Sequence, residues 1–140
     1  YRYSTTVEGG KKVKKSIRRL PDAELEIMKI IWEANEPVTS AYISEKLKGK
    51  KDWKITSILT FLARLTEKGF VECKREGKIN IYRPLISEQE YLERESKSIL
   101  EKLYNNSLTN FVATLYSSNA ISEEELRELQ EFIDKLQRGE

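Results

Sequence analysis

The sequence predicts a mainly α-helical protein with one small β-hairpin, organised as an N-terminal winged helix-turn-helix and a C-terminal helical domain. Three amphipathic segments between residues 22 and 68 come first, and a hairpin pattern centred on Glu76-Gly77 follows them. Three further amphipathic segments occupy residues 87–140. The net charge changes from +8 over residues 1–86 (19 Lys and Arg, 11 Asp and Glu) to −6 over residues 87–140 (6 and 12).

The first two predicted helices are short and amphipathic. Asp22 is a favourable N-cap for the first, and Pro37 ends it. Its apolar stripe is Leu25, Met28, Ile31 and Trp32. Thr39 or Ser40 caps the second helix, which continues to about residue 48 and has one apolar face made by Ile43 and Leu47.

The third predicted helix spans residues 54–68 and stops before Gly69. Its expected buried stripe is Ile55, Ile58, Leu62 and Leu65. Ser57, Thr60 and Arg64 share a different face, which carries small hydroxyls and one guanidinium. Such a face fits the major groove of duplex DNA, where short side chains and Arg reach base edges and phosphates.

The predicted hairpin pairs residues 70–74 with residues 79–82, and a glycine in the turn allows positive φ at low cost. Cations lie at its tip and flank, so the wing is expected to touch the DNA backbone. The residues expected to contact DNA are Lys54, Thr56, Ser57, Thr60, Arg64, Arg75 and Lys78.

Residues 87–140 predict a long helix, a break at Asn105-Asn106, a second helix and a last helix opened by a Ser122/Glu125 capping box. About 54 residues make a marginal core alone, so a symmetric homodimer is expected. The alternative is that these helices fold back on the DNA-binding half, which their negative charge disfavours. The expected dimerisation residues are Tyr91, Leu100, Leu103, Leu108, Phe111, Leu115, Leu126, Leu129 and Ile133.

One cysteine and no histidine narrow the chemistry that is available. Zinc and copper sites built from Cys and His cannot form within one chain, and nucleophile–imidazole pairs are impossible. We therefore expect no metal, no cofactor and no enzymatic activity, with Cys73 as a buried strand residue. A lone thiol fits the reducing cytoplasm, and no apolar run is long enough for membrane insertion.

The expected domains are 1–17, 18–86 and 87–140. The first is either a flexible basic arm, which includes the run KKVKKSIRR, or a remnant foreign to the native protein. The second is the winged helix, and the third is the dimerisation domain.

With these residues in view, the chain resembles the BlaI/MecI/CopY family of bacterial repressors over residues 18–137. The resemblance rests on PDAELEIMKIIWE, TSILTFLARLTEKGFV and EGKINIYRPLISEQEY in this order. It implies a dimer on a two-fold symmetric operator in double-stranded DNA. In the β-lactam-resistance branch it also implies a membrane-bound sensor protease pathway and a cut in the C-terminal domain. Ser57, Thr60 and Arg64 fall on DNA-contacting positions of that branch.

The chain also departs from the family pattern. The segment Trp53-Lys54-Ile55-Thr56-Ser57 replaces a common Trp-Ser/Thr-Pro-Lys-Thr run, which indicates a different operator. The bond aligned with the family's Asn-Phe cleavage site is Thr114–Leu115, and an Asn110-Phe111 pair lies one turn earlier. The C-terminal cysteine motifs of the copper branch are absent. The alternative function is a winged-helix protein-interaction module without specific DNA binding.

Overall fold

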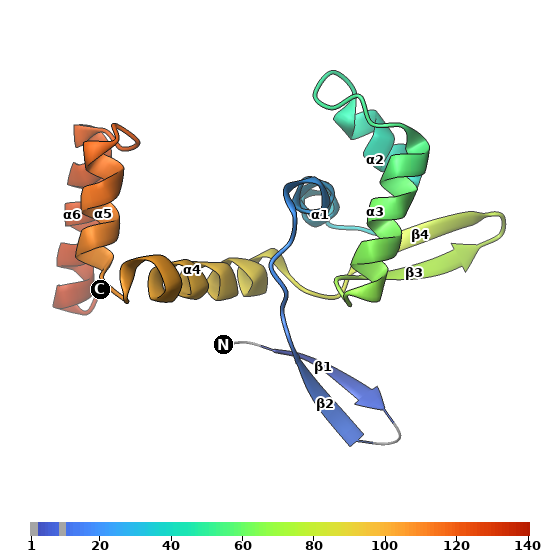
Figure 1. Cartoon of the computed structure of the whole chain (residues 1–140), viewed down its shortest axis with the longest axis horizontal. Helices are drawn as coiled ribbons and strands as arrows, with labels where there is room; N and C mark the ends of the chain where they lie inside the picture. Colours follow the sequence, from blue (N-terminus) through green and yellow to red (C-terminus); the bar gives the residue numbers. More distant parts are fainter. Residues whose placement is uncertain (1–2, 9–10) are drawn as a thin grey trace. The chain divides into compact units, whose positions relative to one another are not determined.

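The computed structural model describes the backbone of residues 3–8 and 11–140 and the side chains from residue 17 onward. Residue contacts divide the chain into two units, with the division between Glu95 and Ser96. In chain order the elements are β1 (Tyr3–Glu8), β2 (Lys11–Ser16), α1 (Asp22–Ala34), α2 (Ser40–Leu47), α3 (Ile55–Glu67), β3 (Val71–Glu76), β4 (Ile79–Pro84), α4 (Glu88–Tyr104), α5 (Leu108–Ser117) and α6 (Glu123–Arg138) (Figure 1). This order confirms the predicted mainly helical fold with a small hairpin.

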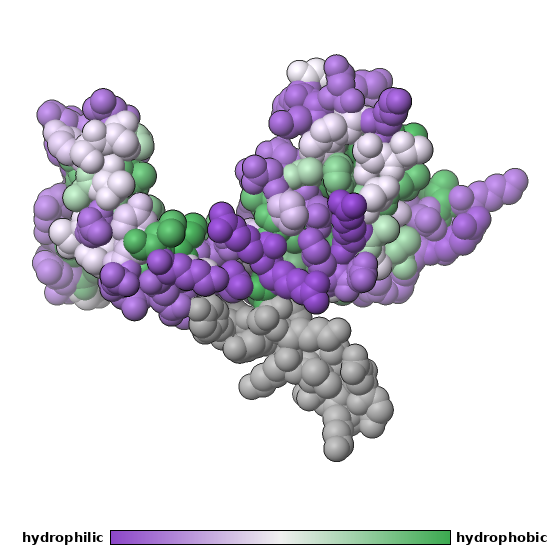
Figure 2. All heavy atoms as spheres, in the orientation of Figure 1, coloured by the Kyte–Doolittle hydropathy of each residue, from purple (hydrophilic) through white to green (hydrophobic). Residues whose placement is uncertain are grey.

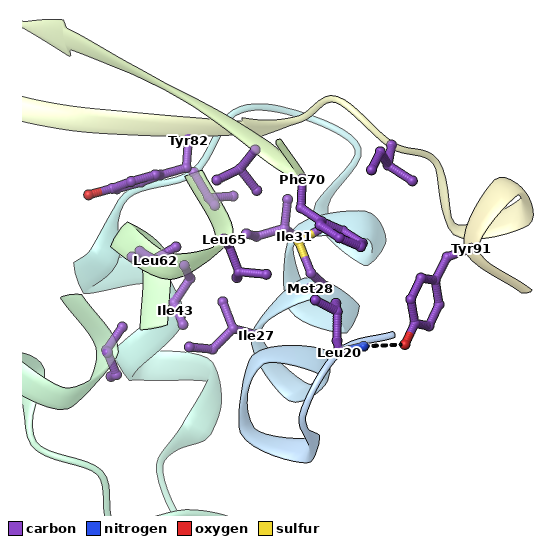
Figure 3. Close-up of a cluster of buried hydrophobic side chains, with 14 of the residues drawn as sticks. Leu20, Ile27, Met28, Ile31, Ile43, Leu62, Leu65, Phe70, Tyr82 and Tyr91 are labelled. Carbon is purple, nitrogen blue, oxygen red and sulfur yellow. Dashed lines mark hydrogen bonds between the residues drawn. The ribbon is translucent and has the colours of Figure 1, made fainter. Parts of the chain in front are cut away.

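The core of the first unit forms where α1, α2 and α3 pack against the start of the β3–β4 hairpin (Figure 3). Each helix contributes apolar residues three or four positions apart, the spacing that keeps them on one face. The fully enclosed side chains include Ile27, Met28, Ile31, Ile43, Ile58, Leu62, Leu65 and Phe70. Because Ile58, Leu62 and Leu65 of α3 are buried in this core, the opposite face of α3 remains in contact with solvent.

Two details of these helices differ from the sequence expectation. Asp22 is the first residue of α1, and Pro21 occupies the cap position, so no side chain caps this helix. Ile55, expected in the buried stripe of α3, is 45% exposed. Ile58, Leu62 and Leu65 already fill the space against α1 and α2, so the first residue of α3 lies beyond the core's edge.

The β3–β4 hairpin is antiparallel, with Glu76 opposite Ile79 and a turn at Gly77, whose φ is +62°. Val38, just before α2, forms a bridge with Tyr82 through two backbone hydrogen bonds of 2.9 and 2.7 Å. This bridge fastens the wing to the helices. Cys73 is exposed, which corrects the expectation of a buried cysteine: it sits opposite Tyr82 but beyond the part of the strand that the helices cover.

The first turns of α4 belong to the first unit. Tyr91, expected among the dimerisation residues, is only 4% exposed, and its hydroxyl accepts a 2.9 Å hydrogen bond from the backbone N–H of Leu20 (Figure 3). Trp32 donates its indole N–H to the carbonyl of Ile86 at 2.8 Å. Tyr91 is thus excluded from any surface, because its ring packs on Phe70 and Trp32 of the same chain.

The second unit contains the rest of α4 together with α5 and α6. Asn105 and Asn106 adopt positive φ between α4 and α5, and Ser107 caps α5. Ser122 and Glu125 form the predicted capping box at the start of α6. All side chains of α5 and α6 are described, and none of them is buried.

The N-terminal segment forms a hairpin of β1 and β2, where the sequence analysis expected a flexible arm or a remnant. Residues 1–2 and 9–10 of that segment lie outside the described residues. Within the described part of the chain, no helix combines the length and apolarity needed to cross a membrane.

Candidate nucleic-acid interface

The exposed face of α3 carries the polar residues that the sequence analysis singled out. Thr56, Thr60 and Arg64 are exposed and Ser57 is half-buried, whereas Ile58, Leu62 and Leu65 on the opposite face are fully enclosed. This division follows from about 100° of rotation per residue. The structure therefore brings the four predicted contact residues onto one outward surface of a rigid element.

The polar groups on this face are available for intermolecular contacts. The Thr60 hydroxyl donates a 3.0 Å hydrogen bond to the carbonyl of Thr56, which leaves its lone pairs and its methyl group for a ligand. Arg64 forms no ion pair with any side chain that the structure describes. Its guanidinium is free to present a planar fork of donors to a base edge or a phosphate.

The N-terminal end of α3 is electropositive. Lys54 occupies the cap position, and no side chain caps the first turn. The unpaired backbone N–H groups of a first turn and the helix dipole both favour anions. Lys50 and Lys51 precede this turn as exposed residues, and Lys48 pairs with Glu45 at 3.0 Å. Lys50 and Lys51 are not among the residues expected to contact DNA, because no local pattern shows how these lysines are placed relative to the start of α3.

The tip of the β3–β4 hairpin supplies a second cationic surface, which is hydrophilic in Figure 2. Arg75 and Lys78 are exposed there, and the Arg75 Nε donates to the Gly77 carbonyl at 3.2 Å. Arg83 and Lys74 both pair with Glu72 lower in the hairpin, Lys74 at 3.8 Å. Within the described hairpin, Arg75 and Lys78 form no ion pair with another side chain, and both lie at the tip beside the exposed Glu76.

Two contacts hold α3 in position. The Lys68 ammonium, at the C-terminal cap of α3, lies 2.5 Å from the carboxylate of Glu24 on α1, whose side chain is 3% exposed. Trp53, just before the helix, packs edge-on against Phe61 with ring centroids 5.3 Å apart. No local pattern in the sequence reveals the pairing of Glu24 with Lys68, because the two residues are 44 positions apart.

Two tyrosines of the first unit have perturbed acidities. Burial, which disfavours the phenolate, is the main cause that raises the pKa of Tyr91. Burial likewise raises the pKa of Tyr82, and the neighbouring Cys73 adds to the effect. Both hydroxyls stay protonated at neutral pH, and that of Tyr91 accepts the hydrogen bond from the Leu20 backbone N–H.

In the second unit, apolar side chains remain in contact with solvent. Leu103 is 71% exposed, and Leu108, Phe132 and Leu136 are each more than half exposed. Of the expected dimerisation residues in this unit, Leu103 and Leu108 are thus exposed, and the rest are half-buried: Leu100, Phe111, Leu115, Leu126, Leu129 and Ile133. A shallow groove of about 180 Å³ runs between α4 and α5 and is lined by Ser96, Ile99, Leu100, Leu108 and Phe111.

Both candidate cleavage bonds lie within α5. Asn110 and Thr114 are exposed and are joined by a 2.8 Å hydrogen bond from the Thr114 hydroxyl to the Asn110 carbonyl. Phe111 packs on Tyr104, with centroids 5.1 Å apart, and Leu115 is half-buried. Cleavage at either bond would require local opening of the helix before an extended backbone could reach a protease.

Comparison with known proteins gives consistent matches over most of the chain. A family model described as "Penicillinase repressor" matches residues 20–135. The penicillinase repressor of Bacillus licheniformis is 36% identical over 121 residues, which cover 86% of this chain and 94% of that protein. The methicillin resistance regulatory protein MecI of Staphylococcus aureus (strain N315) is 30% identical over 116 residues, covering 83% and 94%.

A solved structure also matches the chain. It is the solution structure of the monomeric form of Bacillus licheniformis BlaI in complex with the blaP half-operator. The match has 34% identity and a TM-score of 0.46, and it covers 54% of this chain and 92% of that one.

Proposed function

Because the chain belongs to the penicillinase repressor family, as the matched residues 20–135 establish, we propose that it is a transcriptional repressor without a catalytic role. The resemblance noted in the sequence is thereby confirmed. The proposed repressor holds duplex DNA with its first unit and pairs with a second copy through its second unit. The observation that carries the proposal is the exposed hydroxyl-and-arginine face of α3, opposite a fully buried stripe.

In the proposed complex, α3 enters the major groove. Arg64 would donate to a guanine edge, and the hydroxyls of Ser57 and Thr60 would contact neighbouring bases or phosphates. Lys54, Lys50 and Lys51 would lie along one phosphate strand at the positive end of α3. Arg75 and Lys78 on the wing would contact the backbone beside it. Phosphate contacts of this kind orient a protein on DNA, and base contacts select the sequence.

The proposed partner of the second unit is a second copy of the chain. Leu126, Leu129, Ile133 and Leu136 follow a 3-4-3 spacing on α6, which is typical of a helix–helix seam, and none of them is buried within one chain. The net charge of −6 over residues 87–140 opposes contact with DNA. A two-fold dimer presents its two recognition helices to a palindromic operator, with half-sites about 34 Å apart or a multiple of that.

The printed names of the relatives, a penicillinase repressor and a methicillin resistance regulatory protein, support a role in β-lactam resistance. The proposal further places the protein in the cytoplasm and has repression end through a membrane-bound sensor protease pathway. The proposed cut lies in α5, at Thr114–Leu115 or at Asn110–Phe111. The intact mass of the protein, recovered from its host after antibiotic challenge, tests this part. A fragment that ends at Thr114 or Asn110 supports the proposal, and an uncut chain under full induction overturns it.

Direct binding tests the central proposal. The protein is titrated onto duplexes tiled across the region upstream of its own gene, at several salt concentrations. Saturable binding to one palindromic tile, far above binding to the others, is expected. Equal and steeply salt-dependent binding to every tile would show a basic surface alone. Absence of binding at low salt would favour the protein-interaction module.

A further inference from the structure

The exposed surface of α3 also contains an apolar strip beside the polar face. Ile55, Leu59 and Ala63 follow one another at four-residue intervals, so they lie along one line of the helix. Ile55 is 45% exposed, Leu59 is 41% exposed, and Ala63 is exposed too. The core does not explain this strip, because Ile58, Leu62 and Leu65 fill the space beneath the helix completely.

The strip has a defined place relative to the polar residues. At about 100° per residue, Thr56 and Thr60 lie near the middle of the exposed surface. Leu59 and Ala63 flank them on one side, and Ser57 and Arg64 flank them on the other. The same surface therefore offers hydrogen-bonding groups along one edge and hydrocarbon along the opposite edge, and Thr60 adds a methyl group between them.

The major groove of duplex DNA contains one hydrocarbon group for such a strip to contact. Among the four bases, thymine alone projects a methyl group into this groove, at C5, and apolar side chains recognise it by excluding water. Hydrogen bonds cannot detect that methyl group, so its recognition needs a hydrocarbon surface such as this strip. A helix with both kinds of edge can read a guanine or adenine pattern with one side and a thymine with the other.

We propose that the Ile55–Leu59–Ala63 strip selects thymine in the operator, with Leu59 contacting a C5 methyl group directly. This inference rests on the proposed function, since it requires α3 to enter the major groove. It adds a specificity determinant that the polar residues do not supply. It also assigns a use to the two large apolar side chains of α3 that the core leaves exposed.

Replacing thymine by deoxyuridine tests the proposal, because it removes the methyl group and preserves base pairing. The full chain first selects its preferred duplex from a pool of random sequence. Each thymine of the selected duplex is then replaced singly by deoxyuridine, and affinities are measured for the wild type and for Leu59→Ala. One methyl contact is expected to be worth about fourfold in affinity, the equivalent of one buried methylene-sized group.

The expected result is a wild-type loss of about fourfold at one thymine in each half-site, together with insensitivity of Leu59→Ala to that replacement. Leu85→Ala is the matched control, since Leu85 is 52% exposed in the same unit but lies outside α3. It should keep the wild-type pattern. Thermal unfolding confirms that the variants fold. If Leu59→Ala does not fold, Leu59→Gln replaces it, because glutamine has a side chain of similar length and is a good helix former.

The other outcomes separate the two proposals. A selected duplex whose thymines all tolerate deoxyuridine, or a Leu59→Ala variant with undiminished sensitivity, overturns the thymine contact and leaves the repressor proposal standing. A pool that yields no preferred sequence overturns both.

Discussion

Lys68 at the end of α3 forms an ion pair with Glu24 on α1, and the two charged atoms lie 2.5 Å apart. The Glu24 side chain is 3% exposed and that of Lys68 is 19% exposed. Removal of one partner from a buried pair leaves the other charge without compensation. The resulting loss of folding stability is much larger than the net stabilisation that the intact pair provides. The contact therefore connects the orientation of the candidate recognition helix to the stability of the core.

Lys68→Met should lower the free energy of unfolding by about 3 kcal/mol, because the Glu24 carboxylate would stay buried without its cation. The double variant Glu24→Gln/Lys68→Met should lose clearly less than the sum of the two single variants. Urea unfolding measures all three. Arg83→Met is the control, since Arg83 pairs with Glu72 at an exposed site and should cost less than about 1 kcal/mol. Additive losses would contradict the pairing.

Arg64→Ala should weaken binding to the operator by about 1–3 kcal/mol and leave binding to unrelated duplex almost unchanged, because a base contact acts only on the correct sequence. Fluorescence anisotropy with both duplexes measures the two affinities. Equal weakening on both duplexes would show that Arg64 contacts phosphate instead.

Lys78→Ala, which removes a proposed phosphate contact, is the matched comparison for Arg64→Ala, which removes a proposed base contact. A wing contact to phosphate should weaken both duplexes to the same extent and reduce the slope of log affinity against log salt by about 1. An unchanged slope would remove Lys78 from the interface.

Ile133→Glu should convert a dimer into a monomer, because it places a charge in the apolar seam of α6. Half-sites should still bind weakly, and the full operator should lose the gain that comes from linking two recognition helices. Sedimentation at matched concentrations gives the oligomeric state. Arg127→Glu alters an exposed position of the same helix and should preserve the dimer. A dimeric Ile133→Glu protein would place the interface elsewhere.

Alkaline pH should destabilise the first unit through its tyrosines. Burial raises the pKa of Tyr91 above the ordinary 10.0, so the folded state keeps this proton at pH values where the unfolded chain has lost it. The resulting stability is complete below pH 10 and declines as the pH rises through the folded pKa. Tyr91→Phe should reduce this decline and, by leaving the Leu20 N–H unpaired, cost about 1–3 kcal/mol at neutral pH. Chemical unfolding at a series of pH values tests both effects, and an unchanged pH dependence in Tyr91→Phe would assign the decline to Tyr82.

The local pattern of residues was sufficient for most of the secondary structure. The hydroxyl of Thr39 caps α2, the Ser122/Glu125 box opens α6, and the turn forms at Gly77. Each of these features depends on residues within a few positions of one another. Spacing was also enough to place Thr56, Ser57, Thr60 and Arg64 away from the buried stripe of α3, since a helix repeats regularly.

Burial, in contrast, was decided by neighbours that are distant in the sequence. Spacing assigned Ile55 to the core and Tyr91 to a dimer surface, yet Ile55 lies beyond the edge of the packed helices and Tyr91 is enclosed by Leu20, Trp32 and Phe70. The pairing of Glu24 with Lys68 and the exposure of Cys73 likewise depend on residues that are distant in the sequence. The sequence by itself determined which residues share a face, because that depends on the repeat of a helix or strand. Only the tertiary structure decided what covers each face, because burial depends on the segments that pack against it.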